Sequence, residues 1–117
     1  LSDDAALSTE RTPFQEQLLA MHRDGITAII AENDRIAELI FLACRTIGLR
    51  IPEDFCLCGF DDTNVSRSLG ITSIHQDFAG IGREVGRVLL AALENPAAET
   101  EKIILPVTLV PRSSSLR

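Results

Sequence analysis

The sequence contains no tryptophan, no tyrosine, no cluster of basic residues and no apolar run long enough to cross a membrane. Its core must therefore be built from aliphatic side chains and five phenylalanines. The formal net charge is −6 and there is no basic patch. Because DNA and anionic membranes both require concentrated positive charge, we expect this segment to contact neither.

The chain also lacks a visible signal peptide, and it begins with Leu1 instead of methionine. We therefore expect it to be a piece of a longer protein, so the missing signal peptide says little about where that protein is located. A length of 117 residues, with 45% hydrophobic content, suits a single domain with a real core. The first eleven residues are polar and aperiodic, which predicts a loop or a frayed end.

The cysteines give no sign of metal or redox chemistry. Cys56 and Cys58 are two residues apart in an apolar run, so they share one face of a strand and cannot easily bridge each other. Together with Cys44 they are best interpreted as small buried hydrophobes, which suits a reducing compartment, so we expect a cytoplasmic protein. We expect no metal site and no cofactor.

Apolar runs that alternate with helical patterns predict an α/β fold, with a parallel sheet and helices on both of its faces. Residues 63–69 form a short irregular or helical link. A proline inside the last strand suggests an edge position or a crossing between sheets. The expected strands are 26–31, 55–60, 71–75 and 102–111, broken at Pro106, and the expected helices are 13–24, 34–47 and 78–94.

The helix boundaries carry recognisable capping signals. Thr12, Pro13 and Gln15 have the spacing of a capping box, and Asn33 or Asp34 caps the second helix, which Gly48 ends. Asp77 caps the helix over 78–94. In the second helix, the apolar stripe predicted to pack on the sheet comprises Ile36, Leu39, Ile40, Ala43 and Ile47. Phe41 and Leu42 lie away from that stripe, so this helix is covered on its second side either by a protein partner or by its own chain.

Polar side chains follow each of the first three expected strands. Asn33, Asp61 and Gln76 are the first or second polar residues after the apolar runs. In an open parallel sheet, ligands bind beyond the carboxyl ends of the strands. Two carboxamides and a carboxylate can hold neighbouring hydroxyl groups, because carboxamides donate and accept while the carboxylate is a strong acceptor. The alternative is that these residues only cap helices and turns, as Asp34 and Asp77 are expected to do.

Other candidate chemistry is weaker. Asp61 and Asp62 resemble a carboxylate pair for Mg²⁺ in a phosphoryl-accepting domain, but no further acidic cluster or well-placed lysine accompanies them. His75 has no serine or cysteine spaced for a catalytic triad. We therefore expect no catalytic residues, and we do not expect an enzyme.

Several motifs in order resemble the effector-binding domain of the LacI/GalR transcription regulators. A strand runs into an Asn-Asp pair, a Gly-Leu-x-Ile-Pro-Glu-Asp-Phe segment precedes Gly-Phe-Asp-Asp, and a Gln-Asp-Phe segment and a closing strand follow. Together they cover residues 25 to 113. The matching segments are 25–34, 48–62, 72–78 and 104–113.

The resemblance implies a fold like that of periplasmic sugar-binding proteins, with two α/β lobes and a ligand cleft between them. Residues 1–117 would then be a partial effector-binding domain, mainly its C-terminal lobe. The helix at 78–94 would pack with the missing N-terminal lobe. The residues that contact the effector in the family correspond to Asn33, Asp61 and Gln76.

The function implied is ligand sensing and dimerisation in a sugar-responsive DNA-binding regulator. A sugar or nucleoside would shift the arrangement of the lobes and so change operator affinity. The partners would be that small molecule, a second copy in a homodimer, and DNA only through a helix-turn-helix domain outside this chain. The alternative is an extracytoplasmic sugar-binding receptor of an uptake system, which a signal peptide in the parent sequence would indicate.

Overall fold

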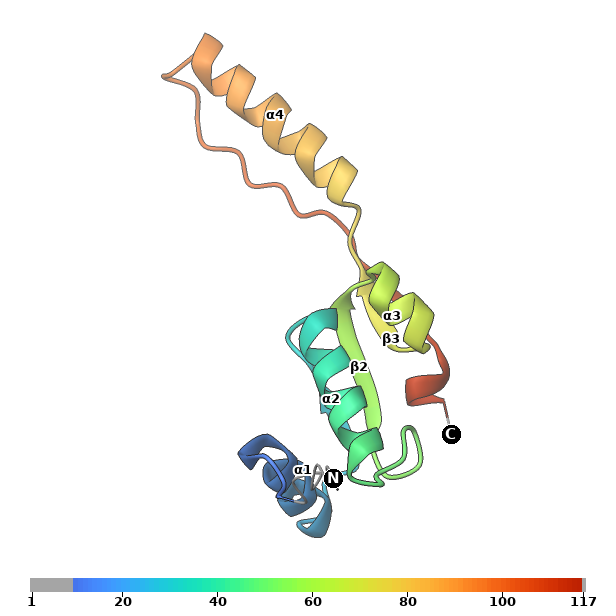
Figure 1. Cartoon of the computed structure of the whole chain (residues 1–117). Helices are drawn as coiled ribbons and strands as arrows, with labels where there is room; N and C mark the ends of the chain where they lie inside the picture. The colour runs from blue at the N-terminus through green and yellow to red at the C-terminus, as the bar shows by residue number, and fades with distance from the viewer. Residues whose placement is uncertain (1–9, 117) are drawn as a thin grey trace, which may run out of the picture.

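Four short strands form a single, mostly parallel sheet in the computed structural model, which describes residues 10–116 (Figure 1). The strands lie side by side in the order of the sequence. The first two pairings are parallel, and the last strand runs antiparallel to its neighbour. This arrangement confirms the expected α/β class. The strands are β1 (Ala28–Ile30), β2 (Cys56–Asp61), β3 (Thr72–His75) and β4 (Thr108–Val110).

The helices begin where the capping signals predict. Thr12 Oγ1 accepts a hydrogen bond from the backbone N–H of Gln15, whose side chain accepts one from Thr12 in return. Asn33 and Asp77 cap the second and fourth helices. The helices are α1 (Pro13–Arg23), α2 (Asp34–Thr46), α3 (Asn64–Leu69) and α4 (Phe78–Glu94), followed by the short 3-10 helix η1 (Ser113–Ser115). Of the expected polar segment at 1–11, residues 1–9 lie outside the described part of the chain.

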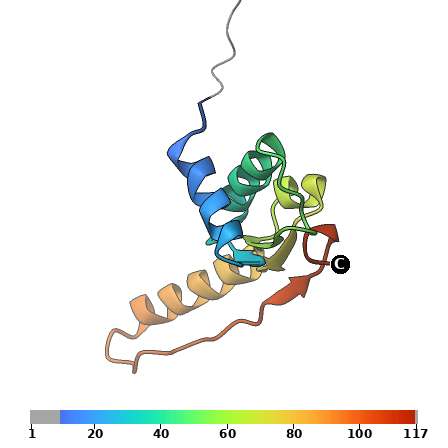
Figure 2. The ribbon, with the colours of Figure 1, turned by 90° about the horizontal axis from the view of Figure 1, so that it is seen from below.

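Helices α1, α2 and α3 lie on the same side of the sheet (Figure 2). The core between α2 and the sheet contains Ala37, Ile40 and Cys44 from the helix and Leu57 and Ile71 from the strand side. In the described residues α4 projects away from the sheet (Figure 1), and on the opposite face the side chain of Ile30 is 83% exposed. The helices expected on both faces are therefore seen on one face in this part of the fold.

The rotation of α2 differs from the predicted one. Ile36 and Leu39, expected against the sheet, are 38% and 44% exposed, whereas Ala37 and Cys44 are fully buried. The reason is polar: Asp34 at the start of the helix is buried and accepts a hydrogen bond from Ser73 of β3. That contact turns the face of Asp34, instead of the most apolar stripe, toward the sheet.

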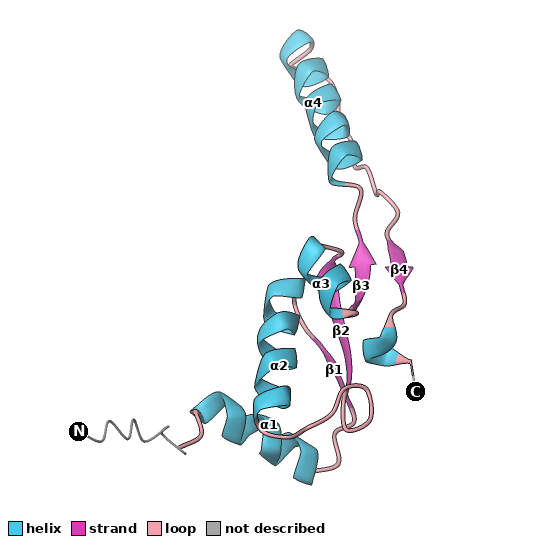
Figure 3. Ribbon diagram, turned by 45° about the vertical axis from the view of Figure 1, so that its right-hand side comes forward, coloured by secondary structure: helices cyan, strands magenta, loops and turns pink. Residues whose placement is uncertain are grey.

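Helix α4 and the chain that follows it project away from the sheet (Figures 1 and 3). No residue of α4 is buried, and residues 101–107 run beside it as an extended segment without strand pairing. The strand predicted over 102–111 is therefore wrong before Thr108. Pro106 has no N–H to donate, and in the described chain no strand lies beside this segment. The radius of gyration is 20.7 Å, against about 13 Å for a compact chain of this length.

None of the helices in the described residues combines the length and the apolar character that crossing a membrane would require.

Candidate functional site

The ends of β2 and β3 bring Asp61 and Gln76 together, as the sequence predicts. Asp61 is the last residue of β2 and is in register with His75, the last residue of β3. Gln76 follows directly, and its side-chain Nε2 donates a hydrogen bond of 2.8 Å to Asp61 Oδ1. Both side chains are only partly buried. The second carboxylate oxygen of Asp61 and the carbonyl oxygen of Gln76 therefore define a polar site at the carboxyl end of the parallel strands.

Asn33 lies after β1 at the same edge of the sheet, but its hydrogen bond goes to its own helix. Its Oδ1 accepts from the backbone N–H of Ile36 at 3.0 Å, which makes Asn33 the N-cap of α2. The capping interpretation of Asn33 is therefore confirmed. Because the cap uses only the oxygen, the side-chain amide NH₂ is the group that Asn33 has to offer a ligand.

The backbone at Asp61 and Asp62 adopts a conformation that few side chains tolerate. The φ angles of these residues are +101° and +52°, in the region that favours glycine. Asp61 adopts this conformation at the last position of β2, where its side chain accepts the hydrogen bond from Gln76. This turn is a local feature that the sequence pattern does not reveal.

Asp62 is buried in a cluster of cationic and hydroxyl groups. Arg67 donates to its carboxylate at 2.9 Å, Arg112 donates to the other oxygen, and His75 Nδ1 lies 3.1 Å away. The backbone N–H of Asp62 donates to Ser73 Oγ at 3.0 Å. The hydrogen bond from Arg67, opposed by burial and reinforced by Arg112, holds the pKa of Asp62 well below its ordinary value.

This cluster separates the two adjacent aspartates. Asp61 binds Gln76, while both oxygens of Asp62 are taken up by guanidinium groups. The carboxylates therefore have different partners, which argues against the interpretation that they bind Mg²⁺ as a pair.

A second buried carboxylate, Asp34, connects α2 to β3 and to the start of α3. It accepts hydrogen bonds from Ser73 Oγ at 2.6 Å and from the backbone N–H of Thr63 at 2.6 Å. Burial works to raise its pKa, but these hydrogen bonds outweigh that effect and hold the pKa below its ordinary value. Gly59 allows the approach, because a Cβ there would lie 2.3 Å from Asp34 Oδ1.

The sequence predicts Asp34 only as a helix cap and predicts no partner for Arg112, so both interactions were missed. A usable signal does exist for Asp34. In alternating strands, Gly59 and Ser73 occupy inward positions where larger apolar residues are usual, which indicates a polar group packed against them. We find no comparable local signal for Arg112, because its partner Asp62 lies 50 positions earlier.

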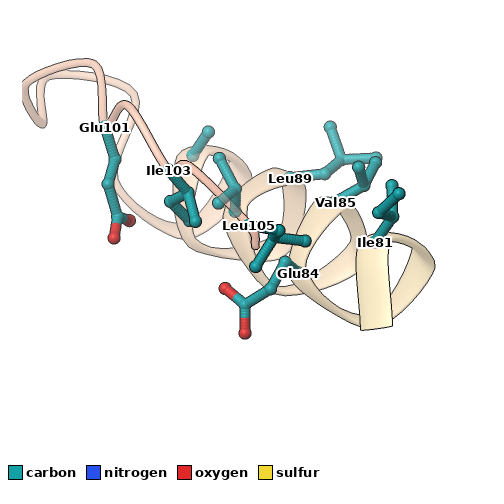
Figure 4. Close-up of a pocket in the computed structure, with 9 residues that line it drawn as sticks. Ile81, Glu84, Val85, Leu89, Glu101, Ile103 and Leu105 are labelled. Atoms are coloured by element: carbon teal, nitrogen blue, oxygen red, sulfur yellow. The ribbon is translucent and has the colours of Figure 1, made fainter. Parts of the chain in front are cut away.

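An apolar hollow lies elsewhere, between α4 and residues 101–105 (Figure 4). Its volume is about 610 Å³ and its walls are mostly apolar, including Val85, Leu89 and Ile103. Glu84 and Glu101 stand at its margin. Such walls offer few partners to hydroxyl groups, so we place the polar ligand site at the strand ends and not here.

Comparison with known proteins gives one consistent answer. Residues 2–115 match the model of the periplasmic binding protein-like domain. The ribose operon repressor of Haemophilus influenzae is 33% identical over 90 residues, which is 75% of this chain and 27% of the repressor. The chain therefore spans about three tenths of the length of the curated relatives it matches.

Solved structures of similar proteins include sugar complexes. The complex of the transcriptional regulator CelR with cellobiose is 28% identical, with a TM-score of 0.78, over 86% of this chain and 31% of that one. A LacI family regulator from Enterococcus faecalis with bound ribose is 29% identical, with a TM-score of 0.77, over 86% of this chain and 39% of that one.

Proposed function

Because the match covers nearly its whole length, the chain belongs to the periplasmic binding protein-like family, in the branch of the LacI-type regulators, and we propose that it is the C-terminal part of the effector-binding domain of a sugar-responsive transcription regulator. The observation that carries the proposal is the hydrogen bond between Gln76 and Asp61 at the ends of two parallel strands. The similar structures with bound cellobiose and ribose support a sugar as the class of effector.

The site has the chemistry that a sugar requires. A hydroxyl group donates to one neighbour and accepts from another. Asp61 supplies a charged acceptor, Gln76 a carbonyl oxygen, and Asn33 an amide donor. Charged acceptors make the stronger hydrogen bonds, so we assign the largest share of the binding free energy to Asp61.

The remaining half of the site would come from a second lobe. We infer that α4 packs against that N-terminal lobe, because none of its apolar side chains is buried in the described chain. Leu93 is 68% exposed, and a Cβ added at Gly82 or Gly86 would meet nothing within 4 Å. An effector that binds one arrangement of the two lobes more tightly shifts the population toward it, and operator affinity changes through that shift.

Two further partners follow from the same proposal. A homodimer would cover the outer face of α2, where Leu42 is exposed and Leu39 lines a hollow together with Phe14 of α1. DNA would be read by a helix-turn-helix domain outside this chain, since the chain itself carries a net charge of −6.

Calorimetric titration of the longer protein that carries this chain, against pentoses, hexoses, cellobiose and nucleosides, tests the proposal. We expect one sugar to bind and Asp61→Asn to weaken it by roughly 10- to 100-fold, because a charge-assisted hydrogen bond is worth about 1.5–3 kcal/mol. Asparagine tolerates the positive φ of Asp61, so the variant removes charge without adding strain.

Asp77→Asn is the matched control. Asp77 is the exposed N-cap of α4, next to Gln76 in sequence, and asparagine caps a helix equally well. Its affinity for the sugar should equal that of the unmodified protein. If Asp61→Asn binds as tightly as the control, the proposed site is wrong.

A further inference from the structure

The turn at Asp61 and Asp62 is held in an unfavourable conformation by the surrounding fold. Two consecutive residues other than glycine have positive φ angles, +101° and +52°. Such conformations persist only where neighbouring contacts overdetermine them, and they occur where a side chain must be aimed. The contacts that fix this turn therefore decide where the carboxylate of Asp61 points.

The main anchor is Arg112, which follows β4. Its Nη2 donates to Asp62, while its Nη1 donates to the backbone carbonyl of Ile71 at 2.8 Å. Its own backbone N–H donates to Thr72 Oγ1 at 2.8 Å. The guanidinium is therefore fixed to the chain at the start of β3 before it reaches the turn. Only 17% of the side chain is exposed.

Arg67 binds the same carboxylate less firmly. It reaches Asp62 from α3 with 51% of its side chain exposed to solvent. On the opposite side of the turn, Ser73 Oγ accepts from the backbone N–H of Asp62 and itself donates to Asp34. The turn is thus held by two contacts of Asp62: its side chain binds Arg112 and its backbone N–H binds Ser73.

We propose that Asp62 and Arg112 are positioning residues for the effector site: their ion pair holds the turn that aims the Asp61 carboxylate at Gln76 and at the ligand. The inference deepens the proposed function and rests on it for the ligand. The aiming of Asp61 toward Gln76 is a property of the protein without ligand, and it is measured separately.

The ligand-free test follows the side-chain amide signals of Gln76 by ¹H–¹⁵N NMR in the full chain. In Arg112→Lys, a single ammonium group replaces the guanidinium group that donates to both Asp62 and the carbonyl oxygen of Ile71. The substitution therefore releases the turn while it keeps the positive charge. We expect the Gln76 signals to move toward those of an exposed amide, and Asp62→Asn to move them in the same direction. Arg50→Lys is the control, because the Arg50–Asp54 pair precedes β2 and lies away from the turn.

Unchanged Gln76 signals in folded Arg112→Lys and Asp62→Asn would overturn the proposal. A fold lost in both variants, under conditions where Arg50→Lys stays folded, would also overturn it. In that case the pair would support the fold as a whole and not the aim of Asp61.

The second arm measures affinity for D-ribose and cellobiose in the longer protein. We expect Arg112→Lys to bind at least about tenfold more weakly than Arg50→Lys, the equivalent of one lost charge-assisted contact. If neither the unmodified protein nor any variant binds either sugar, while the Gln76 signals still shift, the proposed class of effector is wrong and the positioning role stands. If the unmodified protein binds and Arg112→Lys binds equally well, the positioning role fails alone.

Discussion

At the scale of single residues, two buried carboxylates organise the edge of the sheet where the ligand is proposed to bind. Asp34 ties α2 to β3 through Ser73, and Asp62 ties the turn after β2 to Arg112. Both have a lowered pKa, because the groups around them favour the ionised form over the neutral one. Folding stability is therefore coupled to their ionisation.

This coupling predicts a pH dependence. The pKa of Asp62 lies below the value of about 3.9 expected in the unfolded chain, so the unfolded state binds more protons in the interval between the two. The contribution of Asp62 to stability is present above about pH 4 and is lost as the pH falls through its folded pKa. Urea unfolding between pH 7 and pH 2 should show the free energy of unfolding falling below pH 4, and falling less steeply in Asp62→Asn. Parallel curves for the two proteins would contradict this assignment.

The cysteines allow a second prediction at this scale. All three are free thiols, and Cys44 is fully buried on the face of α2 that packs on the sheet. Burial, together with the charge of Asp54, raises the pKa of Cys44 to about 11. We expect Cys44 to resist iodoacetamide at pH 8 while the protein is folded and to react after unfolding in urea, which peptide mass spectrometry can follow. Labelling of Cys44 in the folded state at the rate of Cys56, which is partly exposed, would show that this core is open.

At the scale of elements, the packing of α2 on β2 depends on the absence of a side chain at Gly59. A Cβ there would meet Asp34 Oδ1 at 2.3 Å and the Cβ of Ala37 at 3.3 Å. We expect Gly59→Ala to lower the free energy of unfolding by about 1–3 kcal/mol, measured by urea titration.

The matched control is Gly82→Ala in α4, where an added Cβ meets nothing within 4 Å. Alanine favours a helix interior over glycine by roughly 0.5–1 kcal/mol, so this variant should lose no stability. Equal losses in the two variants would mean that the contact between Gly59 and Asp34 is not what limits that position.

The local elements could be predicted because their signals are local. The capping residues Thr12, Asn33 and Asp77 lie within four positions of the groups they bind, and all three are confirmed. The rotation of α2 could not be predicted from its apolar stripe, since a hydrogen bond that Asp34 accepts from a serine 39 positions later decides it. The strand expected before Thr108 was wrong for a similar reason, because strand pairing needs a neighbour that a periodic pattern cannot supply.

The candidate site divides in the same way. The contact between Asp61 and Gln76 follows from a rule about strand ends in parallel sheets, so the sequence predicts it. The ion pair between Asp62 and Arg112 joins residues 50 positions apart and depends on where the last segment returns to the sheet. No local pattern carries that information.

At the scale of the whole molecule, the exposed apolar surfaces are typical of part of a domain and not of a complete domain that buries its own apolar side chains. Leu89, Leu90 and Leu93 of α4 are each more than half exposed, as is Ile30 on the uncovered face of the sheet. Contiguous apolar patches of this kind mark surfaces that bind another protein segment. In the proposed regulator that segment is the N-terminal lobe.

The isolated chain should therefore self-associate. Analytical ultracentrifugation is expected to show species larger than 12.8 kDa as the concentration rises. Leu89→Glu with Leu93→Glu should shift the equilibrium toward the monomer without lowering the unfolding temperature, because these side chains bury little surface in the single chain. A monomer at every concentration would count against an unpartnered α4.

The central claim is that a sugar binds at the ends of β1, β2 and β3, and a crystal structure of the longer protein with its tightest-binding sugar tests it most directly. We predict sugar hydroxyl groups within hydrogen-bond distance of Asp61 Oδ2, the carbonyl oxygen of Gln76 and the amide nitrogen of Asn33. A sugar bound elsewhere, with the hydrogen bond between Asp61 and Gln76 undisturbed and no hydroxyl within reach of either residue, would contradict the account.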